Sequence, residues 1–283
     1  MNLTVLPDDI AQVLAQNGLC AREIRTLTVT PDPERPRATF RVELDSGAIV
    51  KARRLESPEA ARTQHELRTA MPPAFATVLA RSGAVLIEEW VDGQPVPQEI
   101  PGEPTLREAG RLLASLHAVP RVGDRVLPYA VSTARLSAYV VSRLEYFRDV
   151  GLLDDGTMGA LCTILEVNDP GAARCSLTHQ DFCGENTVID RAGRLRVIDN
   201  ERAGFDFVAL DLARTWYRWG LQDAGWDRFC AAYLTAGGSD TASSGAPFCR
   251  VAGVTVSAWV RLRSAHPALG MPVQVLRRLA SQA

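Results

Sequence analysis

The chain has 283 residues, of which 46% are hydrophobic and 23% charged, and its formal net charge is −2. This composition is typical of a globular protein and disfavours a dedicated nucleic-acid or anionic-membrane binder, which would usually be basic. No apolar run approaches the roughly 18 residues of a membrane span, and no basic, apolar leader begins the sequence. We therefore expect a cytoplasmic protein in which the six cysteines, none spaced as CxxC, are reduced.

The N-terminal part, residues 1–92, is expected to be a small α+β lobe. Its strands alternate with a period of two, and a turn signal at Asp45-Ser46-Gly47 separates two of them. Ser57 and Pro58 suit the N-cap and the first turn of a helix. The expected elements are a helix over 4–17, strands over 24–30, 37–45 and 48–55, a helix from Ser57 to about Ala70, and a strand over 83–91.

The composition changes at residue 93, where a segment rich in proline and glycine is typical of a linker. Residues 93–283 are expected to form a larger, mostly helical lobe, in which Thr105 and Glu108 make a capping box. The expected elements are helices over 105–119, 132–149 and 156–168, short strands over 187–190 and 194–199, and further helices from Ala209 onward. A cleft between two such lobes is an ordinary place for a small-molecule site.

Lys51 is the only lysine among the 31 basic residues of the chain, and all the others are arginines. It lies on the third expected strand, where it shares one face with Ile49 and Arg53. The residue before it is Val50 rather than glycine, which excludes a Walker A phosphate-binding loop. A single position that stays lysine in so arginine-rich a chain is a candidate for a specific contact.

The strongest functional signal is a polar loop followed by a short hairpin. Asp181 and Asn186 lie in the loop HQDFCGEN, and Asp199 follows the second strand of the hairpin, which would fold it back toward the loop. Mg²⁺ prefers oxygen ligands together with water and phosphate, and a carboxylate can orient and deprotonate an attacking hydroxyl. The set therefore suits phosphoryl transfer, in which positioning and charge neutralisation supply most of the catalysis.

These motifs resemble those of the aminoglycoside phosphotransferase/choline kinase-like family, which shares the protein-kinase fold. The HxDxxxxN pattern at 179–186 and the IDxE pattern at 198–201 carry the resemblance, and LHxxP at 116–120 and DLA at 211–213 add to it. Over roughly residues 22–218, the resemblance implies a two-lobed α+β fold, with a small N-terminal β-sheet lobe and a larger, mostly helical C-terminal lobe.

The domain boundary of that fold would lie between residues 92 and 93. The resemblance implies that residues 1–92 are the nucleotide-binding lobe, and that residues 93–283 carry the catalytic loop and the substrate pocket. In the helical lobe, Asp181 is implied to be the catalytic residue that accepts the proton of the substrate hydroxyl. Asn186 and Asp199 are implied to hold Mg²⁺.

The same resemblance implies contacts with the nucleotide. Lys51 would bind its phosphates, and Glu66 would pair with Lys51, with Glu59 as the competing candidate. Backbone groups of Glu89 and Val91, in the implied hinge between the lobes, would meet the adenine. A compact ammonium binds phosphate as a point charge, whereas guanidinium is larger and forked, which gives a physical reason for lysine at position 51.

The sequence departs from the family pattern at the loop between the first two strands. The family usually has glycine there, whereas this chain has no glycine between Gly18 and Gly47 and has PDPERP at the tip. Prolines lack the N–H donors that approach phosphate, so Arg35 or Arg37 is a candidate substitute. Gln180 also stands where the family usually has glycine.

We predict a kinase that transfers the γ-phosphate of ATP or GTP, with Mg²⁺, to a hydroxyl of a small molecule. An antibiotic such as an aminoglycoside is one acceptor, and a ring of carboxylates in the helical lobe would be its binding site. The candidates for that ring are Asp154, Asp155, Asp223 and Asp227. The alternative is a nucleotide-binding pseudokinase or scaffold without turnover. Neither function requires nucleic acid or a membrane, and the protein would be a monomer or a homodimer.

Overall fold

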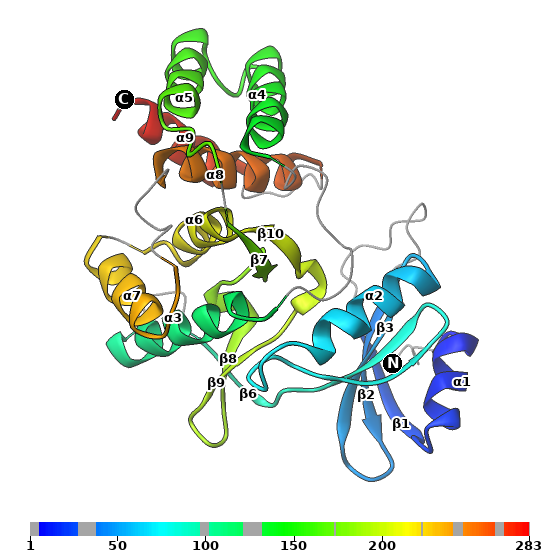
Figure 1. The fold of residues 1–283 in the computed structure, drawn as a ribbon. Helices are drawn as coiled ribbons and strands as arrows, with labels where there is room; N and C mark the ends of the chain where they lie inside the picture. Colours follow the sequence, from blue (N-terminus) through cyan, green and yellow to red (C-terminus); the bar gives the residue numbers. More distant parts are fainter. Residues whose placement is uncertain are drawn as a thin grey trace. The chain divides into compact units, whose positions relative to one another are not determined.

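The structure is a computed structural model that describes residues 6–27, 38–96, 102–120, 132–172, 174–221, 223–239, 246–263 and 269–282. The chain divides into two compact units (Figure 1). Unit 1 comprises Met1–Pro95 and Thr187–Glu201, and unit 2 comprises Val96–Asn186 and Arg202–Ala283. The division differs from the expected boundary at 92/93 because the segment 187–201 returns to the N-terminal unit. The tip 31–36, with Arg35, and the neighbouring Arg37 lie outside the described residues.

Within the described part of unit 1, five antiparallel strands form a sheet in the order β1-β2-β3-β5-β4. They are β1 (Ala21–Thr26), β2 (Ala38–Leu44), β3 (Ile49–Arg54), β4 (Val78–Ser82) and β5 (Val85–Glu89). The strands expected at 24–30, 37–45, 48–55 and 83–91 correspond to β1, β2, β3 and β5. The sequence did not predict β4, because this short edge strand buries only Ala80 and has no apolar face to read.

The two faces of this sheet have opposite character. One face is apolar, and Val42, Val50 and Ile87 pack there against α1 (Asp8–Gln16). The other face carries charged residues and is covered by α2 (Pro58–Thr69), so the two helices lie on opposite sides of the sheet (Figure 1). The Ser57 side chain accepts a hydrogen bond from the N–H of Ala60 at 3.1 Å, which confirms the expected N-cap of α2.

A second, three-stranded sheet of unit 1 has the order β6-β8-β9 in the described residues. Its strands are β6 (Gly93–Pro95), β8 (Thr187–Asp190) and β9 (Leu195–Val197). The N–H of Ala76 donates to the Val197 carbonyl at 2.9 Å, and the N–H of Val197 donates to the Ala74 carbonyl at 2.8 Å. These bonds join the hairpin to the N-terminal segment, so Asp199 belongs to the same unit as Lys51.

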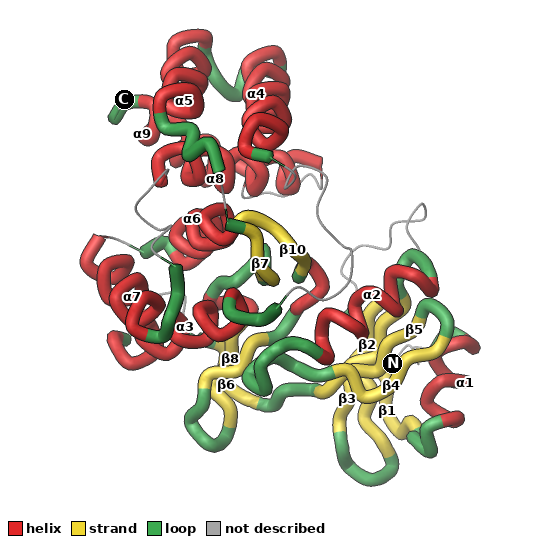
Figure 2. Tube along the Cα trace, in the orientation of Figure 1, coloured by secondary structure: helices red, strands yellow, loops and turns green. Residues whose placement is uncertain are grey.

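Unit 2 is dominated by helices (Figure 2). They are α3 (Glu103–His117), α4 (Thr133–Asp149), α5 (Asp155–Val167), α6 (Val208–Trp219), α7 (Asp223–Thr235), α8 (Ala246–Arg263) and α9 (Gly270–Ala280). No helix within the described ranges is long and apolar enough to cross a membrane. Helices α4, α5, α6, α8 and α9 share one apolar core, in which Leu144, Phe147 and Val251 are fully buried.

Helix α3 packs closely against α7. A Cβ at Gly110 of α3 would lie 2.5 Å from the Phe229 carbonyl oxygen, so only glycine allows this approach. The predicted capping box at Thr105 is wrong, because α3 begins at Glu103 with Gly102 as N-cap. Pro104 fits the first turn, where its missing N–H costs nothing, and this places Thr105 inside the helix.

Two short strands in unit 2 frame the expected catalytic loop. Strand β7 (Cys175–Thr178) leads into the loop, and β10 (Gly204–Phe207) pairs with it antiparallel and leads into α6. Neither strand was predicted, because each has four residues and both are largely buried, so that no alternation is visible. Their pairing brings the start of the loop to the start of α6.

Candidate active site

The catalytic loop of unit 2 is held at its base by one buried carboxylate. Asp211, on α6 and 2% exposed, accepts hydrogen bonds from the backbone N–H of His179 at 2.9 Å and of Gln180 at 2.7 Å. Hydrogen bonds to a buried charged group are among the stronger ones in proteins. The DLA motif therefore fixes the backbone of the loop.

Asp211 is itself supported by a buried histidine. His117 Nε2 lies 3.1 Å from the Asp211 carboxylate, and His117 Nδ1 lies 2.8 Å from the Tyr233 hydroxyl. The ring is 3% exposed and lies close to the loop rather than on the surface. Burial opposes ionisation of Asp211, but the bond and charge of His117 outweigh it, so the pKa of Asp211 is below its ordinary value. The carboxylate stays charged in the interior because it is fully paired.

Within the loop, Asp181 and Asn186 are joined directly. The side-chain amide of Asn186 donates to the Asp181 backbone carbonyl at 2.9 Å, which turns the Asn186 amide oxygen away from that carbonyl. Gln180 adopts a left-handed backbone with φ +64°, a conformation that glycine takes without strain. This explains physically why a glycine-favouring position precedes Asp181, and why glutamine there is strained.

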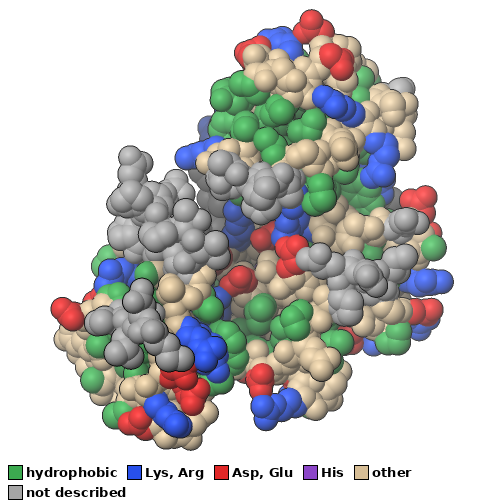
Figure 3. Space-filling model, turned by 180° about the vertical axis from the view of Figure 1, so that it is seen from behind, with side chains coloured by type: hydrophobic (Ala, Val, Ile, Leu, Met, Phe, Trp, Pro, Cys, Tyr) green, Lys and Arg blue, Asp and Glu red, His purple; other side chains and the backbone are tan. Residues whose placement is uncertain are grey.

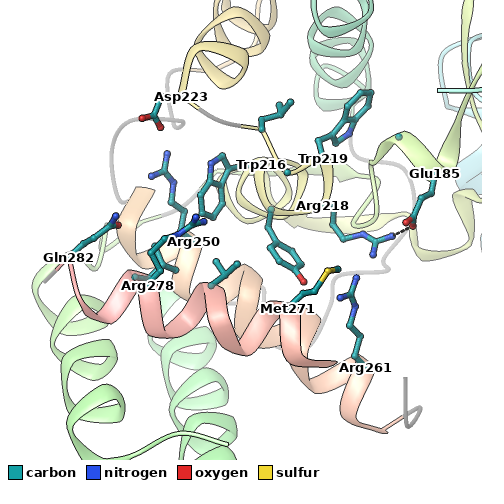
Figure 4. Close-up of a pocket in the computed structure, with 16 residues that line it drawn as sticks. Glu185, Trp216, Arg218, Trp219, Asp223, Arg250, Arg261, Met271, Arg278 and Gln282 are labelled. Atoms are coloured by element: carbon teal, nitrogen blue, oxygen red, sulfur yellow. Dashed lines mark hydrogen bonds and ion pairs between the residues drawn. The ribbon is translucent and has the colours of Figure 1, made fainter. Parts of the chain in front are cut away.

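Arg218 of α6 contacts the Asp181 side chain. Its Nε lies 3.1 Å from Asp181 Oδ1, and its Nη2 lies 2.8 Å from Glu185 Oε2 (Figure 4). Arg214, one helical turn earlier on α6, is 3% exposed and adds a second positive charge near Asp181. No sequence motif marks either arginine, because arginine is a common surface residue and both stand at unremarkable positions of a helix.

These cations determine the charge state of Asp181. Burial of the carboxyl opposes ionisation, but the charges of Arg214, Arg218 and Arg202 outweigh it and lower the pKa of Asp181 below its ordinary value. Asp181 is therefore ionised at neutral pH and can accept a hydrogen bond from a hydroxyl. A carboxylate this acidic is suited to orienting a hydroxyl more than to removing its proton early in the reaction.

Lys51 and Asp199 form an ion pair within unit 1, through Lys51 Nζ and Asp199 Oδ1. The Lys51 side chain is 15% exposed and that of Asp199 is 46% exposed. Asp199 has φ +57°, a left-handed conformation that aspartate tolerates better than most residues. The structure therefore brings together the lone lysine and the carboxylate of the IDxE motif, which are 148 positions apart in the sequence.

A buried charge cluster lies beside this pair on the same face of the sheet. Glu88 of β5, 2% exposed, is 3.4 Å from Arg53 Nη1 and 3.2 Å from Arg68 Nη1. Arg53 also pairs with Glu201. Burial opposes ionisation of Glu88, but Arg68, Arg53 and Lys51 together lower its pKa. Since Glu88 is the register partner of Lys51, the cluster fixes the surroundings of the lysine.

The three glutamates expected near the nucleotide pair with arginines, and not with Lys51, in the part of the chain that the structure describes. Glu66 accepts from Arg62 on α2 at 3.4 Å, and within the described residues no ion pair joins it to Lys51. Glu59 lies near Arg62 at 3.7 Å. Glu89 at the end of β5 pairs with Arg196 at 2.9 Å. In the described chain, no hydrogen bond occupies the backbone of Val91. The roles of Glu66, Glu89 and Val91 toward a nucleotide stay predictions.

The residues expected to hold Mg²⁺ have the right donor chemistry. Asn186 offers an amide oxygen whose direction is fixed by the bond of its NH₂ group to Asp181, and Asp199 offers a carboxylate. No group of three or more His, Cys, Asp or Glu residues in the described ranges could hold a metal by itself. Mg²⁺ is usually bound by one or two protein ligands together with substrate phosphates and water, so Asn186 and Asp199 stay predicted ligands.

Unit 2 also contains a pocket of about 700 Å³ beside the catalytic loop (Figure 4). Gly184 and Glu185 of the loop line it, as do residues of α6, α8 and α9. Trp219 closes one side, and its indole N–H donates to the Phe182 carbonyl at 3.0 Å, which ties this wall to the loop. The volume is in the usual range for small-molecule sites.

The fold and these motifs define a protein-kinase-like enzyme, with an antiparallel sheet in the N-terminal region and a helical remainder, as predicted. The sequence matches the phosphotransferase enzyme family over residues 27–248, and the chain belongs to that family. The match spans the lone lysine, the HxDxxxxN loop and the IDxE and DLA motifs. No curated protein matches the chain significantly.

Solved structures with the same fold include kinases of different acceptors. A macrolide 2'-phosphotransferase from Brachybacterium faecium has a TM-score of 0.67 and 17% identity, over 94% of this chain and 98% of that one. A choline kinase from Streptococcus pneumoniae has a TM-score of 0.70 and 11% identity, over 98% and 99%. An ethanolamine kinase from Plasmodium vivax has a TM-score of 0.62 and 12% identity, over 90% and 82%. At these identities the likeness is one of fold.

Proposed function

We propose that the protein is a kinase that transfers the γ-phosphoryl group of ATP or GTP to an alcohol hydroxyl of a small molecule. The observation that carries the proposal is Asp181, an ionised and partly buried carboxylate that a loop fixed by Asp211 holds beside a pocket. Family membership and the fold of the similar kinases support the same reaction class. We expect the enzyme to act in the cytoplasm as a monomer or homodimer.

In the proposed reaction, the acceptor oxygen forms a bond to the γ-phosphorus while the bond from that phosphorus to the β,γ-bridging oxygen breaks. The nucleoside diphosphate leaves with the bonding electron pair, and the hydroxyl proton passes to Asp181 and then to solvent. Asp181 orients the hydroxyl, and Arg218 keeps the carboxylate ionised and in place. Lys51 binds phosphate oxygens as a point charge.

Asn186 and Asp199 are the proposed magnesium ligands, and the bound ion would neutralise phosphate charge. Glu66 is the proposed partner of Lys51 once a nucleotide draws the lysine from Asp199. The backbone groups of Glu89 and Val91 are the proposed adenine contacts. Within the described residues no hydrogen bond occupies the backbone of Val91, whereas the Glu89 N–H donates to the Thr77 carbonyl at 3.0 Å. A hydroxyl-bearing antibiotic is one acceptor class to screen, because kinases of macrolides and of choline share the fold.

The test is nucleotide consumption with a broad pool of hydroxylated compounds and MgATP or MgGTP. We expect acceptor-dependent consumption by the wild type, and a loss of about 10²–10⁴-fold in turnover for Asp181→Ala, the usual range for a group of this kind. Glu166→Ala, at an exposed position of α5, is the control for loss of a carboxylate and should keep its activity. Nucleotide binding without consumption would instead support the pseudokinase alternative, and full activity of Asp181→Ala would refute the role of that residue.

A further inference from the structure

The pocket beside the catalytic loop is rich in arginine. Among the described residues that line it, the charged side chains are Arg218, Arg250, Arg261 and Arg278, with Glu185 and Asp223 as the only carboxylates. The chain as a whole has a net charge of −2 and shows both signs interspersed on the face drawn in Figure 3. The positive excess is therefore a local property of the pocket.

Two of these arginines, Arg250 and Arg278, form no ion pair with a carboxylate of the described residues. No carboxylate of the described residues lies within 4.0 Å of Arg250 or Arg278. Arg250 instead lies over the ring of Trp216, with 4.6 Å between its guanidinium carbon and the ring centroid. Stacking on an aromatic face leaves the N–H edge of guanidinium free to donate to an anion. Arg218, by contrast, is paired with Asp181 and Glu185.

The arginines occupy different ends of the pocket. In Figure 4, Arg250 and Arg278 lie toward Gln282, whereas Arg218 and Arg261 lie toward Glu185. Arg250 and Arg261 are eleven positions apart on α8, which corresponds to about 16 Å along the helix. Arg218 contacts the proposed catalytic residue Asp181. Arg250 and Arg278, which have no ion pair within the described residues, therefore lie at the end of the pocket away from Asp181.

The wall between these ends is aromatic and apolar. Trp216, Tyr217 and Trp219 line it together with Met271 and Val275. Such a surface suits a ring or a flat apolar body, because aromatic side chains bury large areas and stack on planar groups. The pocket thus offers anion donors at one end, aromatic and apolar side chains in its lining, and at the other end Arg218, which contacts the proposed catalytic carboxylate Asp181.

We propose that the acceptor of this kinase is a hydroxyl-bearing organic acid with a ring in its body. Its carboxylate, sulfate or phosphate group binds Arg250 and Arg278, its ring packs on Trp216, and its hydroxyl reaches Asp181. This proposal rests on the proposed kinase function and adds the substrate class. Of the four carboxylates considered for a polycationic antibiotic, only Asp223 lines the pocket, and Asp154 instead caps α5 by accepting from the Thr157 N–H at 2.7 Å. The positive excess would repel a polycation.

The test measures binding rather than turnover, by calorimetry without nucleotide. The probes are three matched nitrophenyl glycosides: the glucuronide is an anion, the glucoside is neutral, and the glucosaminide with a free amine is a cation. We expect the glucuronide to bind at least roughly tenfold tighter than the glucoside, and the glucosaminide weakest, as charge-assisted hydrogen bonds predict. The preference should shrink as salt rises.

Variants locate the effect in the pocket. Arg250→Gln and Arg278→Gln should each reduce glucuronide affinity by roughly three- to tenfold and leave glucoside affinity unchanged. Arg135→Gln removes the same charge from an exposed position of α4 that has no ion pair within the described residues, and it should change neither affinity. Unchanged melting temperatures would show that each variant is folded.

Equal binding of the three glycosides, tighter binding of the amine, or binding of none would overturn the proposal. A glucuronide preference that Arg135→Gln weakens as much as Arg250→Gln would also overturn it, since the charge would then act from the whole surface. Failure of the kinase function has a separate signature: the acid would bind with the expected preference, but no nucleotide would be consumed with any hydroxylated compound. The two outcomes are therefore distinguishable.

Discussion

Each of the two units contains a carboxylate that is 2% exposed and organises a functional segment, but the two do so differently. In unit 2, Asp211 binds backbone N–H groups and so fixes the course of the catalytic loop. In unit 1, Glu88 binds the guanidinium groups of Arg53 and Arg68 and so fixes side chains around Lys51. A carboxylate that binds two neighbouring backbone N–H groups, as Asp211 does, needs one residue type at one position. A cluster of charged side chains, as around Glu88, can be built from residues at many positions of a sheet.

This difference has a consequence for function. Loss of the Asp211 carboxylate removes the hydrogen bonds that fix the loop with Asp181 and Asn186, so the stability of the fold and the turnover should fall together. Loss of Glu88 removes the carboxylate that Arg68 and Arg53 share and leaves Arg53 with Glu201, which costs stability first and affects Lys51 through its surroundings. The two carboxylates can therefore be told apart by comparing the loss of folding free energy with the loss of turnover.

The largest effect is expected for Asp211→Ala. The variant leaves His117 and two buried N–H groups without their acceptor, so we expect a loss of about 3–5 kcal/mol in the free energy of unfolding. Turnover should fall as well, because the loop is no longer fixed. Urea unfolding at several pH values gives a second check. A carboxyl with a lowered pKa in the folded state stabilises above its unfolded pKa, and this contribution disappears as pH falls through the folded pKa.

That part of the acid sensitivity should therefore be present in the wild type and absent from Asp211→Ala. Asp227→Asn, at an exposed site on α7, is the matched control for charge and should change unfolding by less than about 0.5 kcal/mol. Wild-type stability and turnover in Asp211→Ala would show that Asp211 does not fix the catalytic loop.

A smaller loss of stability is expected for Glu88→Gln. Glutamine keeps an acceptor oxygen, and Arg53 retains Glu201, so about 2–4 kcal/mol is expected in chemical unfolding. Glu59→Gln, at an exposed position of α2, serves as the control. Its free energy of unfolding should lie within about 0.5 kcal/mol of that of the wild type. If Glu88→Gln lowered turnover in the folded protein as strongly as Asp211→Ala, the contrast between the two carboxylates would be lost.

The smallest effect on folding is expected for Arg218→Gln, and its readout is a pH profile. Arg218 is one of the cations that lower the pKa of Asp181, so its removal should raise that pKa. The acidic limb of the kcat profile should then move to higher pH, because Asp181 must be ionised to orient the hydroxyl. Arg135→Gln should leave the acidic limb in place. An unshifted acidic limb in Arg218→Gln would show that Arg218 does not set the charge state of Asp181.

Much of the site was visible in the sequence. The loop with Asp181 and Asn186 and the carboxylate of Asp199 were predicted from residue type and spacing, because these residues act at fixed positions along a continuous backbone. The DLA motif with Asp211 came from the family resemblance. The pairing of Lys51 with Asp199 was not predicted, since the expected partner of Lys51 was Glu66. The order of sheet-rich and helical parts followed from the hydrophobic patterns, whereas the return of 187–201 to unit 1 did not.

The remaining features depend on tertiary packing that no short pattern encodes. Arg218 and Glu88 are ordinary charged residues until α6 and β5 bring them beside their partners. Strands β4, β7 and β10 are too short or too evenly buried to alternate visibly. The arginine pocket gathers residues from three helices that are far apart in the chain, so its charge could not be counted before those helices were placed.

The central claim is that Asp181 supports phosphoryl transfer to a small hydroxylated molecule. Mass spectrometry of a pooled set of hydroxylated acids, neutral alcohols and amines, incubated with MgATP or MgGTP, tests it most directly. We expect the wild type to add one phosphoryl group to a member of the pool, and Asp181→Ala to form about 10²–10⁴-fold less product in the same time. An unmodified pool with wild-type protein that binds the nucleotide, or the same phosphorylated product formed equally by Asp181→Ala, would contradict it.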